Sequence, residues 1–140
     1  MPTRINCENR NSKRRIDLAR IEKAARKVLG LLKKSNIELN IIFFSNQKIR
    51  ALNRKFMGID RSTDVISFDG AGSFLGDVAI SSDMSFKNAK IYGATFMEET
   101  VLYVIHGILH LVGYDDRTVN ARTAMKEKEN GLFQKIKETF

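Results

Sequence analysis

Residues 101–116 read VLYVIHGILHLVGYDD, and the predicted fold is built outward from this stretch. Apolar side chains surround almost the whole circumference of a helix drawn through it, so we expect a central, buried helix from about Met97 to Val112. Gly113 provides the stop signal for that helix. His106 and His110 are the chain's two histidines, and they lie one turn apart on one face, with β-carbons roughly 6 Å apart.

The rest of the chain predicts one small mixed sheet with helices around it. Alternating or continuous apolar runs predict strands over 4–7, 37–44, 64–68 and 74–80, and Gly70-Ala71-Gly72 is expected to turn the last two into a hairpin. The polar residues 8–15 are expected to form a loop. Capping signals and apolar spacing predict further helices over 16–36, 45–58, 81–90 and 119–137. The expected fold class is therefore α+β, with about four strands and five helices in a single domain over 1–140.

The chain is strongly basic, with 24 Lys and Arg against 16 Asp and Glu, a formal charge of +8 and a pI near 9.8. A positive field favours polyanions, with nucleic acid first and an anionic membrane second. A basic protein without such a partner is the plainer alternative. Arg20, Lys23, Arg26 and Lys27 share the polar face of the helix expected over 16–36, which is either a solvated face or an RNA-facing stripe.

Cysteine usage and hydropathy favour a cytoplasmic protein. Cys7 is the single cysteine and therefore has no internal disulfide partner. The N-terminus lacks the apolar core of a signal peptide. The longest apolar run, within 101–112, is shorter than the roughly 20 residues that span a bilayer, so no membrane partner is expected.

The histidine pair predicts a metal site on the central helix. Burying two imidazoles without partners would cost a few kcal/mol, and ligation removes that cost. Asp116, ten residues after His106, is the expected third ligand once the chain turns at Gly113. Asp115 is the rival ligand, or it holds a histidine ring from behind. The alternative is a pair of core histidines hydrogen-bonded to the backbone.

Two imidazoles and one carboxylate leave open coordination positions, which is typical of catalytic zinc and also of non-haem iron. Gly107 stands between the histidines although glycine costs about 1 kcal/mol in a helix interior, so we expect another backbone or a substrate to approach there.

The segment HGILHLVGYDD at 106–116 resembles the signature of the YbeY family of metal-dependent endoribonucleases and ribosomal RNA maturation factors. Two further blocks also resemble that family. One comprises Leu52-Asn53, Phe56, Gly58, Asp60 and STDVISF at 62–68, and the other is LGDVAIS at 75–81. Order and spacing hold from about Ile37 to Arg117.

The resemblance implies a small mixed sheet surrounded by helices, one bound Zn²⁺ or another divalent metal, and His106, His110 and Asp116 as its ligands. It also implies cleavage of single-stranded RNA during maturation and quality control of small-subunit ribosomal RNA. Two positions depart from the family. Asp116 replaces a histidine, which makes the ion a weaker Lewis acid. Met57 replaces an arginine, for which Arg54, Lys55 or Arg61 are candidate substitutes in RNA binding.

Three functions compete. The first is a hydrolytic endoribonuclease, with Glu99 and Tyr103 on the histidine face as supporting residues and no certain catalytic base. The second is a metallopeptidase, which Gly107 argues against because such enzymes carry a glutamate there. The third is a non-catalytic, ribosome-associated RNA-binding factor with a bound metal, which Met57 favours.

Overall fold

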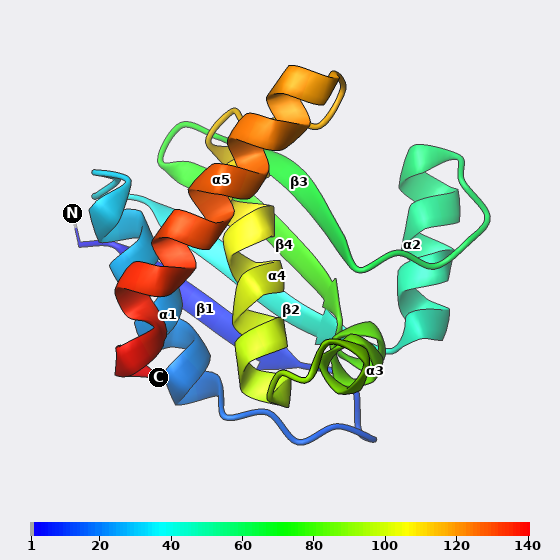
Figure 1. Ribbon diagram of the computed structural model, residues 1–140. Coiled ribbons are helices and arrows are strands. Elements are labelled where there is room, and N and C mark those ends of the chain that lie inside the picture. The colour runs from blue at the N-terminus through cyan, green and yellow to red at the C-terminus, as the bar shows by residue number, and fades with distance from the viewer. Residues whose placement is uncertain (1) are drawn as a thin grey trace.

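A four-stranded mixed sheet carries five helices in the computed structural model, which describes residues 2–140 (Figure 1). The predicted α+β class is confirmed. In chain order the elements are β1 (Arg4–Asn9), α1 (Leu18–Leu31), β2 (Glu38–Phe44), α2 (Asn46–Met57), β3 (Val65–Ala71), β4 (Phe74–Ser81), α3 (Ser82–Tyr92), α4 (Phe96–Leu111), α5 (Val119–Ile136) and a short 3₁₀ turn (Lys137–Thr139).

The strands lie in the order β1-β2-β4-β3. β1, β2 and β4 run parallel, while β3 pairs antiparallel with β4. The carboxyl ends of the three parallel strands therefore share one edge of the sheet, from which α2 and α3 start. Ser45 and Ser81 cap these two helices by accepting hydrogen bonds from Lys48 N and Met84 N.

Several predicted boundaries are wrong. β1 continues to Asn9, which pairs with Phe43, so the loop expected over 8–15 is shorter. β3 runs through Gly70 to Ala71, which pairs with Phe74, and the hairpin turn is Gly72-Ser73.

The first helix is also shorter than predicted, because it starts at Leu18 behind the capping side chain of Asp17 and ends at Leu31. Lys33 and Asn36 take positive φ values of 58° and 57°, which stop helical winding before Ser35-Asn36.

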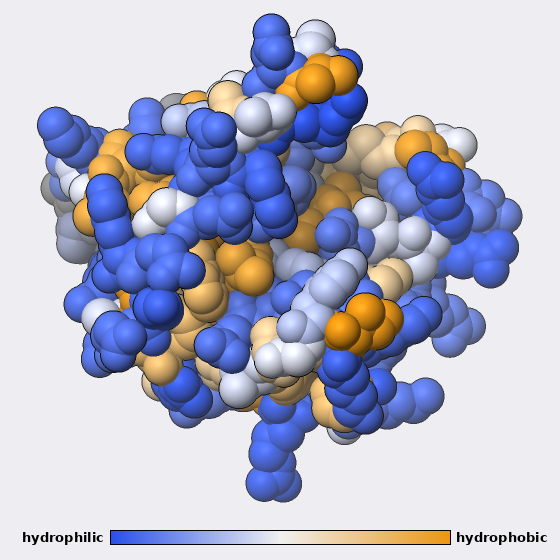
Figure 2. Space-filling view, viewed as in Figure 1, coloured by the Kyte–Doolittle hydropathy of each residue, from blue (hydrophilic) through white to orange (hydrophobic). Residues whose placement is uncertain are grey.

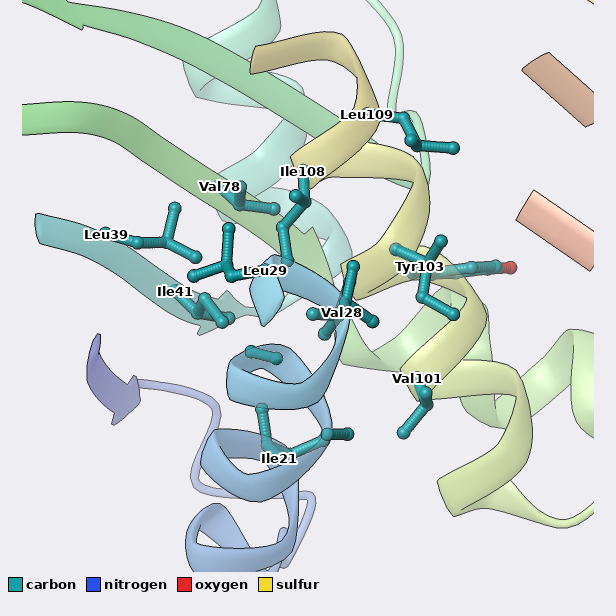
Figure 3. Close-up of a cluster of buried hydrophobic side chains, with 14 of the residues drawn as sticks. Ile21, Val28, Leu29, Leu39, Ile41, Val78, Val101, Tyr103, Ile108 and Leu109 are labelled. Atoms are coloured by element: carbon teal, nitrogen blue, oxygen red, sulfur yellow. The ribbon is translucent and has the colours of Figure 1, made fainter. Parts of the chain in front are cut away.

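One face of the sheet is covered by α1 and α4, with α5 packed on α4 (Figure 1). Figure 3 shows how this core closes: Val28 and Leu29 of α1 and Ile108 of α4 meet Leu39, Ile41 and Val78 of the sheet. All of these side chains are essentially inaccessible to solvent. The helix predicted to be central is central.

Gly107 is the point where α4 lies closest to the sheet. A β-carbon there would collide with the Val78 side chain and lie 3.1 Å from Val65 Cγ1. Ser67 Oγ also donates a 2.9 Å hydrogen bond to the carbonyl of Gly107. The expectation that a backbone or a substrate approaches Gly107 is therefore wrong, because sheet side chains fill that space.

The second face of the sheet is covered only in part. Ile49 and Leu52 of α2 pack against Phe44, Ile66 and Ala79. Beyond α2, the strands carry an asparagine ladder: Asn6 Nδ2 donates to Asn40 Oδ1 at 2.9 Å, and Asn40 Nδ2 donates to Asp77 Oδ1 at 3.0 Å. Polar side chains thus link β1, β2 and β4 where no helix covers them.

A second polar group, the Asp83 cluster, ties loops to the carboxyl edge of the sheet. Asp83 accepts hydrogen bonds from Asn46 N at 2.9 Å, Asn11 Nδ2 at 3.0 Å and Arg14 Nε at 3.0 Å. Although partial burial alone would raise it, the pKa of Asp83 is lowered by these bonds. The cluster joins the segment after β1 to the first turns of α2 and α3.

Candidate metal centre

Helix α4 positions both histidines. Its first turn is fixed by a capping box, in which Thr95 and Glu98 exchange hydrogen bonds of 3.0 and 2.8 Å with each other's backbone N–H. The rings of His106 and His110 lie with centroids 4.9 Å apart at an interplanar angle of 75°. Both side chains are half-buried, at the rim of the core and not within it.

His106 is held by a carboxylate from α5. Nδ1 of its ring lies 3.0 Å from Oε2 of Glu129, which is buried. Burial lowers the pKa of His106, but the hydrogen bond and charge of Glu129 outweigh it and the net direction is upward. The alternative in which backbone groups hold the histidines is wrong for His106. Because the carboxylate is paired with Nδ1, the lone pair of Nε2 in this ring is available to ligate a metal ion.

His110 has a different environment. Its pKa is lowered, first by burial and then by the neighbouring His106, so the neutral imidazole that can bind a cation is favoured. The carboxylate of Asp116 acts on both imidazoles in the direction that raises their pKa. All three predicted ligands therefore share one electrostatic neighbourhood.

Asp116 and Asp115 lie on the turn after α4. The Asp116 side chain is exposed, and its backbone carbonyl accepts a 3.2 Å hydrogen bond from Arg122 Nη1. Asp115 Oδ1 accepts from Arg117 N at 3.1 Å and thus shapes the turn. Within residues 2–140, no three His, Cys, Asp or Glu side chains converge as a metal-ligand cluster, so the ligand set stays a prediction.

A cavity of about 600 Å³ opens beside His110. We call it the arginine cavity, because its lining includes Arg61 and Arg117, together with Met57, Asp115 and Asp116. Of the three basic candidates for RNA binding, only Arg61 lines this cavity. Arg54 and Lys55 are exposed residues of α2, and Lys55 Nζ lies 5.3 Å from the centre of the Phe56 ring.

A second cavity of about 620 Å³ lies beside His106. We call it the acidic cavity, and its polar lining comprises Asp64, Asn88, Tyr92, Glu99, Tyr103, His106, Lys126 and Glu129. Glu99 and Tyr103, the predicted supporting residues, therefore lie on the histidine side of α4. Burial raises the pKa of each. The hydroxyl of Tyr103 accepts a 2.6 Å hydrogen bond from Asn88 Nδ2.

The sequence that builds this region matches a known protein family. A family model described as Endoribonuclease YbeY matches residues 6–137. The chain belongs to the YbeY family. The match covers the whole sheet from Asn6 onward and all five helices, so the family likeness extends well beyond the histidine segment.

Individual relatives agree. The Endoribonuclease YbeY of Elusimicrobium minutum is 36% identical over 115 residues, which cover 77% of this chain and 80% of the relative. That of Aquifex aeolicus is 35% identical over 130 residues, covering 89% and 87%. The solution structure of TM1509 from Thermotoga maritima matches with a TM-score of 0.67 at 28% identity, covering 94% of this chain and 88% of that one.

Two carboxylates near the histidines were missed from the sequence. Glu129 lies 23 residues after His106, and Asp64 lines the acidic cavity from the segment before β3. The sequence did hint at the position of Glu129, because Met125, Leu132 and Ile136 lie at helical spacing around it and are buried. An acidic residue in a core-facing row needs a partner inside the protein, and here the partner is an imidazole.

Proposed function

We propose that this protein is a metal-dependent endoribonuclease that cuts single-stranded RNA during maturation and quality control of small-subunit ribosomal RNA. Membership of the YbeY family and relatives named as endoribonucleases support the nuclease activity. The net charge of +8 suits an RNA substrate. The observation that carries the proposal is the His106–Glu129 pair beside His110.

The donor set fits one Zn²⁺ per chain, or another divalent ion. His106 and His110 offer imidazole nitrogens from one helix face, and Asp116 offers a carboxylate from the following turn. Glu129 on Nδ1 of His106 is the kind of outer partner that fixes the tautomer and orientation of a ligating ring. A bound divalent ion would polarise a phosphate oxygen or activate water.

The chain's own residues would bind and orient the RNA backbone. Arg61 and Arg117 line the arginine cavity beside His110, where guanidinium groups can donate paired hydrogen bonds to a phosphate. Met57, at the position of the family's arginine, lines the same cavity. We therefore propose that Arg61, and not Arg54 or Lys55, takes the place of that arginine.

The test joins elemental analysis of purified protein to cleavage of a single-stranded RNA. We expect a stoichiometric divalent metal in the unmodified protein, and loss of both metal and cleavage in His106→Ala. Asp116→Asn should weaken metal binding, whereas the matched control Asp115→Asn should leave it unchanged. Full cleavage by the metal-free protein would overturn the proposal.

A second candidate function is a ribosome-associated RNA-binding factor whose metal has no catalytic role. It is favoured by Met57, because an apolar side chain at the phosphate-facing position removes one charged contact. Under this alternative, a His106→Ala protein would still bind the small ribosomal subunit and support normal maturation. Either function would operate in the cytoplasm, where ribosomal RNA is the partner.

None of the helices within residues 2–140 is both long and apolar enough to cross a bilayer. The face that bears α4 and α5 is mostly hydrophilic, with apolar residues scattered between charged ones (Figure 2). The family membership and the net charge of +8 support RNA as the polyanion that we propose for this surface.

A further inference from the structure

The two cavities that flank the histidines differ in charge. The acidic cavity has the carboxylates of Asp64, Glu99 and Glu129 and a single cation, Lys126, whose Nζ lies 3.9 Å from Glu129 Oε1. The arginine cavity also has three carboxylates, those of Asp69, Asp115 and Asp116, but it sets two guanidinium groups beside them and is therefore less negative. Of the two linings, the second alone offers guanidinium groups that can donate paired hydrogen bonds to a phosphate, and the first is the more strongly repulsive to it.

A single-stranded RNA that passes over the histidines therefore has a preferred orientation. Its phosphate group belongs on the arginine side, and what faces the acidic side must be neutral. The neutral part of a nucleotide that lies nearest its backbone is the base, a flat ring with hydrogen-bond donors and acceptors on its edge. The volume of about 620 Å³ falls in the range of small-ligand sites.

Tyr92 gives the acidic cavity a stacking surface. It is the last residue of α3, followed by Gly93 in a left-handed conformation, and 71% of its surface is exposed although it lines the cavity. An exposed aromatic ring beside a cleavage site is a platform for an unpaired base. Its neighbour Ile91 is 62% exposed but does not line the cavity.

The polar lining favours a base that donates hydrogen bonds. Asp64 uses Oδ1 to accept from Val65 N at 2.8 Å and from Thr63 Oγ1 at 3.3 Å, which leaves Oδ2 for a further donor. Asn88 donates through Nδ2 to Tyr103, which leaves its carbonyl oxygen as an acceptor. Adenine, cytosine and guanine carry an exocyclic amino group with two N–H donors, one for each of these oxygens, whereas uracil has the single N3–H donor.

We propose that the acidic cavity is a base subsite: it holds one unpaired, amino-bearing nucleobase of the RNA, stacked on Tyr92 and hydrogen-bonded to Asn88 and Asp64. Asn88 and Asp64 then determine base specificity next to the scissile phosphate, and Tyr92 adds stacking that any base can use. The inference rests on the proposed RNA cleavage and adds which bases the site prefers.

Binding of non-cleavable 2′-O-methyl RNA hexamers to the purified protein tests the subsite directly. The probes are all-uridine and the same hexamer with one adenosine or one cytidine, followed by fluorescence anisotropy. Because an amino group can hydrogen-bond to both Asp64 and Asn88 and uracil has no such group, we expect the amino-bearing probes to bind roughly 10-fold more tightly than all-uridine. Tyr92→Ala should lose about 10-fold in affinity for them.

The controls separate a base subsite from a general loss of binding. Tyr92→Phe keeps the ring and should keep the affinity, and Ile91→Ala should bind like the unmodified protein. Asn88→Ala should remove the preference for amino-bearing probes while all-uridine binding persists. Equal binding of all probes, or equal binding by Tyr92→Ala and Ile91→Ala, would overturn the subsite.

A parallel cleavage assay on unmodified RNA distinguishes this failure from that of the proposed function. If RNA is cut but no base preference exists, the subsite is wrong and the nuclease stands. If RNA is not cut but the Asn88-dependent preference and the Tyr92-dependent affinity are measured, the subsite is supported and the cleavage activity is wrong.

Discussion

The Asp83 cluster and the histidine centre are both polar groups that join segments far apart in the sequence, but they differ in how completely they are satisfied. Both carboxylate oxygens of Asp83 accept hydrogen bonds, from three protein donors in all. One ring nitrogen of His106 is paired with Glu129. A cavity of about 620 Å³ opens beside His106, and one of about 600 Å³ opens beside His110. A saturated polar cluster stabilises the fold, whereas donor atoms left facing a cavity are available to a ligand.

The strongest way to break this comparison is to remove a proposed metal ligand that does not support the fold. His110→Ala should lower RNA cleavage about 1,000-fold, or about 4 kcal/mol in barrier height. Its melting temperature should stay within a few degrees of the unmodified protein, because the side chain is half-buried at the rim of the core. Single-turnover cleavage and calorimetry measure the two effects. A large loss of stability would place His110 with the structural residues instead.

Glu129→Gln sharpens the comparison, because it keeps the shape of the side chain but removes its charge. We expect a divalent metal to bind about 10- to 100-fold more weakly, since the residue holds the His106 ring. Competition with a metal-binding dye measures this. Glu127→Gln, an exposed neighbour on α5, is the matched control and should change nothing. Equal affinities for the two variants would contradict the role given to Glu129.

Gly107→Ala changes the packing of α4 against the sheet at the residue that follows His106, and it leaves every polar group in place. Its methyl group would overlap Val78, so we expect a loss of about 2 kcal/mol in the free energy of unfolding. Gly131→Ala is the control, because its added methyl group meets nothing within 4 Å, and it should stabilise α5 by about 0.5–1 kcal/mol. Urea denaturation compares the two. Equal effects would show that α4 can move away from the sheet.

Asp83→Asn should have the smallest effect and one that depends on pH. We expect a loss of about 1–2 kcal/mol at pH 7, with cleavage retained in the folded protein. The pKa of Asp83 is lowered in the folded state, so its contribution is complete above the unfolded pKa of about 3.9 and disappears as the pH falls through the lower folded value. Stability curves of the two proteins should therefore converge in acid. Asp60→Asn, on an exposed ion pair with Arg50, should change stability little at any pH.

Much of the fold followed from local sequence signals. The apolar 101–112 run predicted the central helix, and the serine caps and Gly58 bounded α2 as expected. Errors fell where tertiary pairing overrides local preference. Gly70 and Ala71 look like a turn but remain in β3 because β4 pairs with them, and Asn9 extends β1 because Phe43 offers a partner.

The candidate site was predictable only along one helix. His106, His110, Glu99 and Tyr103 share a face of α4 by simple spacing, so their proximity could be read from the sequence. Glu129 and Asp64 reach the same region from other elements, and no local rule gives that contact. Arg61 could not be distinguished from Arg54 and Lys55 as an RNA-binding residue, because the path of the segment after α2 decides which of them lines the cavity beside His110.

The asparagine ladder on the open face of the sheet also bears on how the strands find their alignment. Asn40 bonds to β1 on one side and to β4 on the other, while its neighbours Leu39 and Ile41 are fully buried on the opposite face. Sliding β2 by one residue would place an amide in the hydrocarbon interior and two aliphatic side chains in water. Both changes raise the free energy of a misaligned sheet, so the side chains of Asn6, Asn40 and Asp77 favour the native strand register during folding.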